Sequence, residues 1–281
     1  MAEPGQIKPR PSGAAAVLAE RASLRAFAGL AVLLFAVSAA VTIVWCGSMS
    51  AMGAMPMPGG WTMSMAWMRM PGQSWPGAYA SFLGMWVVMM VAMMLPSVAP
   101  VLWRYRRTVC RTRAVHQGRL TAVAAAGYFA VLGGVGMAAF PLGILLAAIE
   151  MQYPELARTV PVAAGVIVLI AGMLQFTAWK ARHLACCREH PAHCATRTVN
   201  AGSAWRYGLK LGLHCSCCCG GATAILLAAG VMDLRTMAVV MAAVTAERLA
   251  PAAQRVARAI GVIVLGVGLF LIVRASKLLL S

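Results

Sequence analysis

Five side chains that can bind a soft metal ion fall within six consecutive positions of an apolar run that reaches Met232. They are His214, Cys215, Cys217, Cys218 and Cys219. Thiolates and imidazoles are soft or borderline ligands that suit Cu(I), Zn(II) and related metals. Such polar groups are unfavourable in an apolar segment unless something binds them there. The stretch therefore predicts a metal site in a membrane protein.

Two other interpretations of this stretch stay open. Cys215 and Cys218 have the CxxC spacing of a redox dithiol, and a position at the start of a helix would favour their thiolate forms. A membrane thiol-disulfide oxidoreductase is therefore an alternative. Small residues such as Gly220 and Gly221 also allow close helix packing, and the cysteines would then serve only as small packing residues.

A second group of cysteines and histidines lies in the segment 180–207. Its candidate ligands are His183, Cys186, Cys187 and His190, with His193 and Cys194 beyond them. If the preceding helix continues into this segment, His183, Cys187 and His190 share one face until Pro191 ends it. Three or four of these groups could complete a tetrahedral site, and reduced thiols without a role are the alternative.

Methionines are concentrated in one part of the chain, with thirteen of the 20 between residues 49 and 94. Eight of them lie in the loop 47–77, among glycine, proline and tryptophan. Thioethers select Cu(I) or Ag(I) over Zn(II), so this loop is a candidate collector of metal. Adaptable apolar filler at a membrane surface is the alternative.

The following apolar run carries Met85, Met89 and Met93 at a spacing of four, which places the three on one stripe of a helix. Met90 and Met94 lie beside the stripe. The spacing is similar to the Met-x-x-x-Met of high-affinity copper transporters. The stripe predicts a thioether path across the bilayer, and ordinary core packing is the alternative.

Two polar residues interrupt other apolar runs. Glu247 lies near the end of the sixth run beside Arg248, and Gln175 lies in the fourth. An intramembrane carboxylate indicates a site for ion or proton passage. A Glu247–Arg248 pair that reaches the membrane surface is the equally acceptable structural interpretation.

The composition indicates how these groups are held. Hydrophobic residues make up 61% and charged residues 11% of the 281 positions, against about 25% charged in soluble domains. Apolar runs near the ~20 residues of a spanning helix cover 25–46, 78–102, 121–149, 159–179, 208–232, 234–249 and 256–275. We expect an all-α, polytopic transmembrane bundle of about seven spans: a single domain, 25–281, after a disordered cytoplasmic tail, 1–24.

The basic residues predict the orientation. The net charge of +17 is concentrated in alternate loops, such as 103–120 and 180–207, whereas 47–77 carries only Arg69. The positive-inside rule then places the amino terminus and the Cys/His-rich loop inside, and the Met-rich loop and the carboxy terminus outside. This distribution favours a lipid bilayer and excludes a nucleic acid as the partner of the basic charge.

Several motifs together resemble a bacterial family, DUF2182, of predicted metal-binding integral membrane proteins. The resemblance covers roughly residues 78–270. The stretches are Met85–Ser97, Ala171–Lys180 with Cys187-Arg188, Cys215–Cys219, Gly230–Asp233 and Glu247-Arg248. It maps the family cysteines onto Cys215, Cys218 and Cys219. This chain departs from the pattern with Cys217 for glycine, Gly220 for tryptophan, Asp233 for asparagine and Arg248 for lysine.

The resemblance implies a multi-pass protein of the bacterial inner membrane. With the residue patterns, it predicts a non-enzymatic protein that binds a soft metal, Cu(I) first and zinc or another soft metal second. Copper uptake, handling or delivery is the expected role, with a metallochaperone or membrane complex as partner. An accessory or assembly subunit of a membrane complex is an alternative beside the oxidoreductase.

Overall fold

The computed structural model describes residues 13–51, 53, 55–57, 61–63, 67, 69, 72–109, 114–188, 200–230 and 233–280. These residues form eight helices and one small hairpin. The elements are α1 (Gly13–Ala51), β1 (Met55–Met57), β2 (Trp61–Met63), α2 (Trp75–Thr108), α3 (Ala114–Gln152), α4 (Pro154–Leu174), α5 (Ala178–Arg188), α6 (Ala201–Ala229), α7 (Leu234–Leu249) and α8 (Ala253–Leu280). The predicted all-α helical bundle is confirmed.

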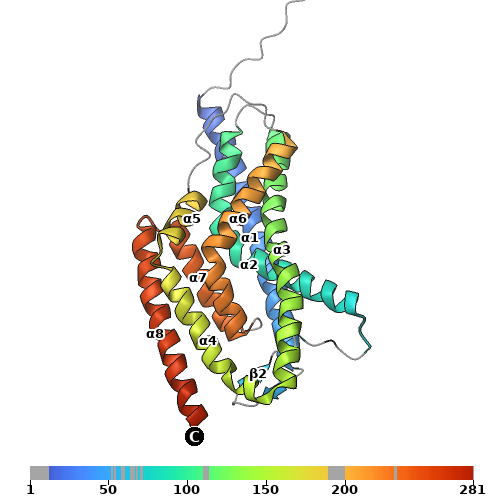
Figure 1. The fold of residues 1–281 in the computed structure, drawn as a ribbon. Helices are drawn as coiled ribbons and strands as arrows, with labels where there is room; N and C mark the ends of the chain where they lie inside the picture. The colour runs from blue at the N-terminus through green and yellow to red at the C-terminus, as the bar shows by residue number, and fades with distance from the viewer. Residues whose placement is uncertain are drawn as a thin grey trace, which may run out of the picture.

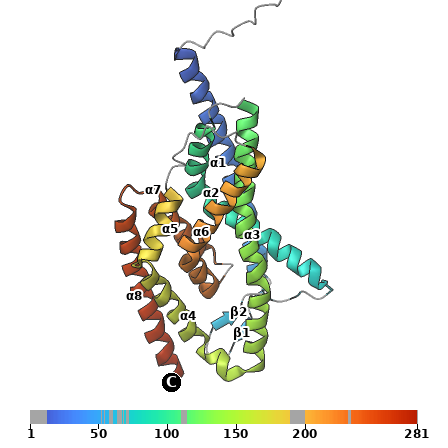
Figure 2. The same ribbon diagram turned by 45° about the horizontal axis from the view of Figure 1, so that its top comes forward.

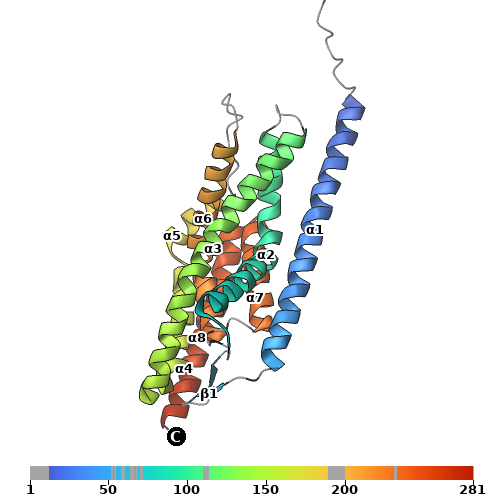
Figure 3. The same ribbon diagram turned by 90° about the vertical axis from the view of Figure 1, so that its right-hand side faces the viewer.

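The helices run up and down along one bundle (Figure 1). Within the described residues, all helices except α5 and α7 are long and apolar enough to cross a membrane. Helix α7 has 16 residues, about 24 Å at 1.5 Å per residue, which is shorter than a hydrocarbon core of about 30 Å. The expected seven runs thus correspond to six helices that are long enough to span a membrane and the shorter α7. Helix α1 begins at one end of the bundle and α8 ends at the other (Figures 1 and 3).

The structure differs from the sequence expectations in three segments. Helix α1 begins at Gly13, so the described part of the expected tail is helical, because alanine, leucine, glutamate and arginine in 14–25 favour helix; residues 1–12 lie outside the described part. The expected fourth helix ends at Leu174, and α5 is a separate helix after a turn. The Met-rich loop contains the antiparallel strands β1 and β2.

Helix α2 carries the buried core of the bundle. All five methionines from Met85 to Met94 are buried, as is Trp86, whose indole N–H donates to the carbonyl of Leu132 in α3 at 3.0 Å. The helix bends along its length (Figure 1). Pro96 and Pro100 lie inside it and each removes one backbone hydrogen bond, which accounts for a bend.

Helices α3 and α6 pack closely because glycines face the partner backbone. A Cβ built on Gly208 would lie 2.1 Å from the carbonyl oxygen of Ala124, and one on Gly127 would lie 2.7 Å from that of Trp205. Only glycine allows this approach. The contact brings Tyr128 of α3 against the cysteine-bearing part of α6.

Candidate metal centre

Four thiols from two helices meet in the interior of the bundle. Cys187 of α5 and Cys215, Cys218 and Cys219 of α6 are between 0% and 3% exposed. Cys218 lies beside both Cys187 and Cys219, and Cys219 lies beside Cys215. We call these four residues the thiol cluster. Three of its members are the cysteines that the sequence singled out in α6, and the fourth comes from the predicted second group.

The thiol cluster lies near the middle of α6. Cys215 is the fifteenth of the 29 residues that begin at Ala201, and Asn200 and Ser203 close a capping box at the helix start. The apolar run begins only at Gly208, which predicts that the cysteines lie near the start of a helix. That placement is wrong, and the helix dipole, which acts on the first turn, does not explain how these thiols ionise.

A buried guanidinium lies among the thiols. Nη2 of Arg248 in α7 is 3.7 Å from Sγ of Cys187 and 3.7 Å from Sγ of Cys219. Its Nη1 donates to the hydroxyl of Ser97 at 3.3 Å, while its Nε has no hydrogen-bond partner among the described residues. Arg248 is 6% exposed and stays protonated at any accessible pH. An anion is therefore favoured beside it.

The neighbouring carboxylate does not supply that anion. Glu247 lies 2.9 Å from Nζ of Lys180 at the start of α5, and both side chains are buried. The alternative of a Glu247–Arg248 pair at the membrane surface does not hold, because Glu247 pairs with Lys180 and both Glu247 and Arg248 are buried. Lys180, Glu247 and Arg248 are the buried charged residues of the described part of the chain. Together they leave one positive charge next to the thiols.

Hydroxyl groups complete the surroundings of the cluster. The phenol of Tyr128 is 3.0 Å from Sγ of Cys215. Ser97, which Arg248 contacts, follows Met93 by four residues in α2. The stripe of Met85, Met89 and Met93 therefore continues, at the same spacing, to a residue that contacts the guanidinium of the cluster.

The two described histidines of the predicted set also meet. Nδ1 of His183 is 3.1 Å from Nδ1 of His214, and the edge of Trp179 packs on His183. One helical turn later on both helices, Cys187 contacts Cys218. The histidines are half-buried, so they connect the buried thiols to the surface of the bundle.

The remaining predicted site residues lie apart from the cluster. Cys217 is half-buried and Cys186 is exposed. Gln175 caps α4 and packs against Gly261 of α8, and its Oε1 has no partner among the described residues. His190 lies outside the described residues.

The thiols are not arranged as a ready-made metal site. Among the described residues, no three or more Cys, His, Asp and Glu side chains form a group that could hold a metal ion. Cys187 and Cys219 contact Arg248, and Cys215 contacts Tyr128. Metal binding therefore requires rotation of thiols away from these partners, which a cysteine side chain achieves through its single χ1 torsion.

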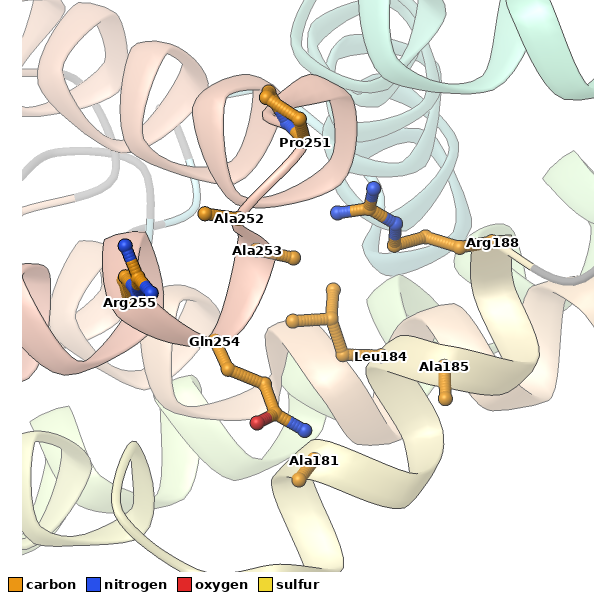
Figure 4. Close-up of a pocket in the computed structure, with 9 residues that line it drawn as sticks. All are labelled: Ala181, Leu184, Ala185, Arg188, Pro251, Ala252, Ala253, Gln254 and Arg255. Carbon is orange, nitrogen blue, oxygen red and sulfur yellow. The ribbon is translucent and has the colours of Figure 1, made fainter.

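A cavity of about 870 Å³ opens between α5 and the segment that joins α7 to α8 (Figure 4). Residues of α5 line one wall, and the α7–α8 turn with the first residues of α8 lines the other. Arg188 donates to the carbonyl of Ala250 at 2.6 Å. The lining residues are Ala181, Leu184, Ala185, Arg188, Pro251, Ala252, Ala253, Gln254 and Arg255. None carries sulfur or imidazole, so the cavity is not the metal centre.

Three residues of the site are not predicted by the sequence patterns: Lys180, Tyr128 and Ser97. Lys180 begins the basic segment 180–207, which hydropathy predicts to be a loop, and its pairing with Glu247 joins residues 67 positions apart in the chain. The one available signal was that Arg248 and Glu247 end an apolar run, where a buried charge needs a partner.

A model of the family described as PpoB2, copper chaperone, matches residues 83–271, which is more than half of the chain. The matched segment includes the methionine stripe, the thiol cluster and Arg248. No curated protein and no solved structure matches the chain.

Proposed function

Because the chain belongs to the PpoB2 family, described as copper chaperones, we propose that it is a membrane-embedded copper chaperone that binds Cu(I) in the thiol cluster. The observation that carries this proposal is the contact of Arg248 with Cys187 and Cys219 among four buried thiols. The role requires binding and release of the ion, and no catalysed reaction.

Charge and ligand type favour Cu(I) over Zn(II). Thiolates select Cu(I), which two of them can hold, whereas structural zinc takes four ligands in a tetrahedron. Cu(I) bound by two thiolates carries a net charge of −1. This charge balances the guanidinium of Arg248, which Glu247 leaves uncompensated by pairing with Lys180. A bound Cu(I)–dithiolate thus makes the buried centre neutral.

The methionine stripe supplies a path to the cluster. Met85, Met89 and Met93 are buried in α2, and the next position of the stripe, Ser97, contacts Arg248. Transfer of Cu(I) from neutral thioethers to thiolates is downhill. We propose that the ion moves along this stripe from the outer side to the cluster.

The other end of the path is the histidine pair. His183 and His214 are half-buried one turn from Cys187 and Cys218, so they are the first ligands that a partner at the surface reaches. The positive-inside rule assigns the arginine-rich ends of α2 and α3 to the cytoplasm of a bacterial inner membrane. Delivery to a metallochaperone or a membrane complex on that side is the proposed outcome.

Metal analysis of the purified protein tests the central claim. The protein loaded with Cu(I) under reducing conditions is compared with a variant that carries Cys215→Ser, Cys218→Ser and Cys219→Ser. A Cys46→Ser variant is the matched control, because Cys46 is also buried but lies in α1. Loss of copper from the triple variant alone supports the proposal, and equal copper in all three proteins refutes it.

The same proteins test the oxidoreductase alternative. That role requires a disulfide between Cys215 and Cys218 that forms and breaks without metal. Alkylation of the metal-free protein before and after mild oxidation measures it. A reversible disulfide with no bound copper would favour the enzyme, whereas stable thiols that bind copper would favour the chaperone.

A further inference from the structure

Three methionines and a tryptophan of the β1–β2 hairpin lie on one face. The register places Met55 opposite Met63 and Met57 opposite Trp61. Residues that alternate along a strand point to the same side, so these four share one face of the hairpin and Thr62 lies on the other. Burial agrees with this assignment, since Met63 is 2% exposed and Thr62 is exposed.

The methionine face is turned toward the protein. The indole N–H of Trp61 donates to the carbonyl of Ala157 in α4 at 2.9 Å, and Ala157 is buried. The hairpin lies where α3 and α4 meet, at the end of the bundle where α8 finishes (Figure 2). The face is therefore partly enclosed between the hairpin and the helices, with Met63 buried and Met55 and Met57 half-buried.

This enclosure has the chemistry of a soft-metal site. Directly opposed residues of an antiparallel pair have Cβ atoms about 5 Å apart, within which flexible methionine side chains can converge on one ion. The strands Met-Pro-Met and Trp-Thr-Met contain no acid, imidazole or thiol, so a hard metal finds no ligand there. The face of an indole attracts a cation as well.

We propose that Met55, Met57 and Met63 form a second Cu(I) site, with Trp61 beside it, at the end of the bundle opposite the start of α1. The inference rests on the proposed copper function and deepens it, because it names where the ion is first bound. The site uses thioethers only, so it stays functional in an oxidising compartment where thiols are lost. Cu(I) captured there is available to the stripe of α2.

Silver titration of the full chain tests the site, since Ag(I) binds thioethers as Cu(I) does and does not change oxidation state. The hairpin variant carries Met55→Leu, Met57→Leu and Met63→Leu, which keep volume and apolarity and remove sulfur. The matched control carries Met137→Leu, Met151→Leu and Met173→Leu, three exposed methionines of α3 and α4. Bound silver per chain and quenching of Trp61 fluorescence, identified by Trp61→Phe, are measured.

We expect the hairpin variant to lose one Ag(I) per chain and the Trp61 quenching, while the control retains both. The cysteine triple variant should lose the silver of the thiol cluster and keep the hairpin-bound Ag(I) with its Trp61 quenching. Unchanged stoichiometry in the hairpin variant overturns the second site, even if the cysteine variant loses metal and the thiol cluster stands. If the cysteine variant binds as much silver as the unaltered protein, the proposal of metal binding in the thiol cluster is refuted. The hairpin site is still tested, because the hairpin variant is compared with the unaltered protein separately. Should the hairpin variant not fold, Met55→Leu, Met57→Leu and Met63→Leu are titrated as single variants. An Ag(I) affinity that is unchanged in all three overturns the proposal.

Discussion

The carboxylate of Glu247 lies 2.9 Å from the ammonium of Lys180, on another helix, and not against Arg248 beside it in the chain. The pair neutralises itself and leaves Arg248 as an uncompensated buried cation. The groups within reach of its Nη2 are the thiols of Cys187 and Cys219. The electrostatics of the site therefore favour an anionic centre at the sulfur atoms.

Replacing Arg248 should weaken copper binding more than it disturbs the fold. Arg248→Met removes the charge that balances a Cu(I)–dithiolate, and we expect Cu(I) affinity to fall about tenfold or more, which is about 1.4 kcal/mol per tenfold. Arg248→Lys retains the charge and should retain most of the affinity. Competition with a coloured Cu(I) chelator measures both values.

The matched control is Arg255→Met, which removes a cation from the wall of the cavity between α5 and the α7–α8 turn, away from the thiols. Its affinity should equal that of the unaltered protein. Equal affinities for the Arg248→Met and Arg255→Met variants would show that the guanidinium does not act on the metal.

The Lys180–Glu247 pair should show strong non-additivity. Lys180→Met leaves a buried carboxylate without a partner, and loss of one member of a buried pair lowers the free energy of unfolding by about 3–5 kcal/mol. The double variant Lys180→Met, Glu247→Leu should recover most of that loss. The free energies of unfolding of these proteins in mixed detergent micelles give the non-additivity as a double-mutant cycle.

The exposed pair of Arg158 and Glu155 provides the comparison, at side-chain exposures of 55% and 85%. Glu155→Gln should change the free energy of unfolding by less than about 1 kcal/mol. A Lys180→Met effect as small as this would mean that water reaches the buried pair.

Two glycines of α6 should respond to alanine with opposite signs. A Cβ on Gly208 would lie 2.1 Å from a backbone oxygen of α3, so Gly208→Ala must separate the helices, at about 1–3 kcal/mol of stability. Gly220 has nothing within 4 Å, so Gly220→Ala should stabilise the helix by up to about 1 kcal/mol. The free energy of unfolding of each variant is the measurement, and equal signs would contradict this packing.

The fold could be predicted because bilayer length and apolar runs leave few alternatives. The runs of 78–102 and 256–275 each became a helix that extends past the expected ends, since the flanking residues also favour helix. The break between α4 and α5 could not be predicted from hydropathy. It lies at Gln175–Thr177, where no proline or glycine marks the end of the helix.

The ligand types of the site could be predicted, but not their partners. Cys215, Cys218 and Cys219 stand out by spacing alone, whereas their contact with Cys187 depends on how α5 turns back onto α6. Tyr128 reaches Cys215 only because Gly127 and Gly208 let two helices approach closely. Such contacts between distant segments follow from packing, which a single sequence does not display.

The start of α7 should give stability a pH dependence of known sign. Asp233 caps this helix: its carboxylate accepts hydrogen bonds from the side chain and backbone N–H of Thr236 and from the backbone N–H of Arg235. The hydrogen bond from the Thr236 hydroxyl, foremost among these, lowers the pKa of Asp233 below its ordinary value of 3.8. A lowered folded-state pKa means that the ionised cap stabilises the protein above pH 4 or so, and that this stability is lost as pH falls through the folded pKa.

We therefore expect Asp233→Ala to lower the free energy of unfolding by about 1 kcal/mol at pH 7, the usual effect of losing an N-cap. The difference from the unaltered protein should shrink as the pH falls below 4. Asp233→Asn, which caps without a charge, should differ from Asp233→Ala by an amount that does not vary with pH, because neither variant titrates at this position. Unfolding in mixed micelles at pH 7 and pH 3 measures all three proteins, and an Asp233→Ala effect that grows on acidification would contradict the cap as its cause.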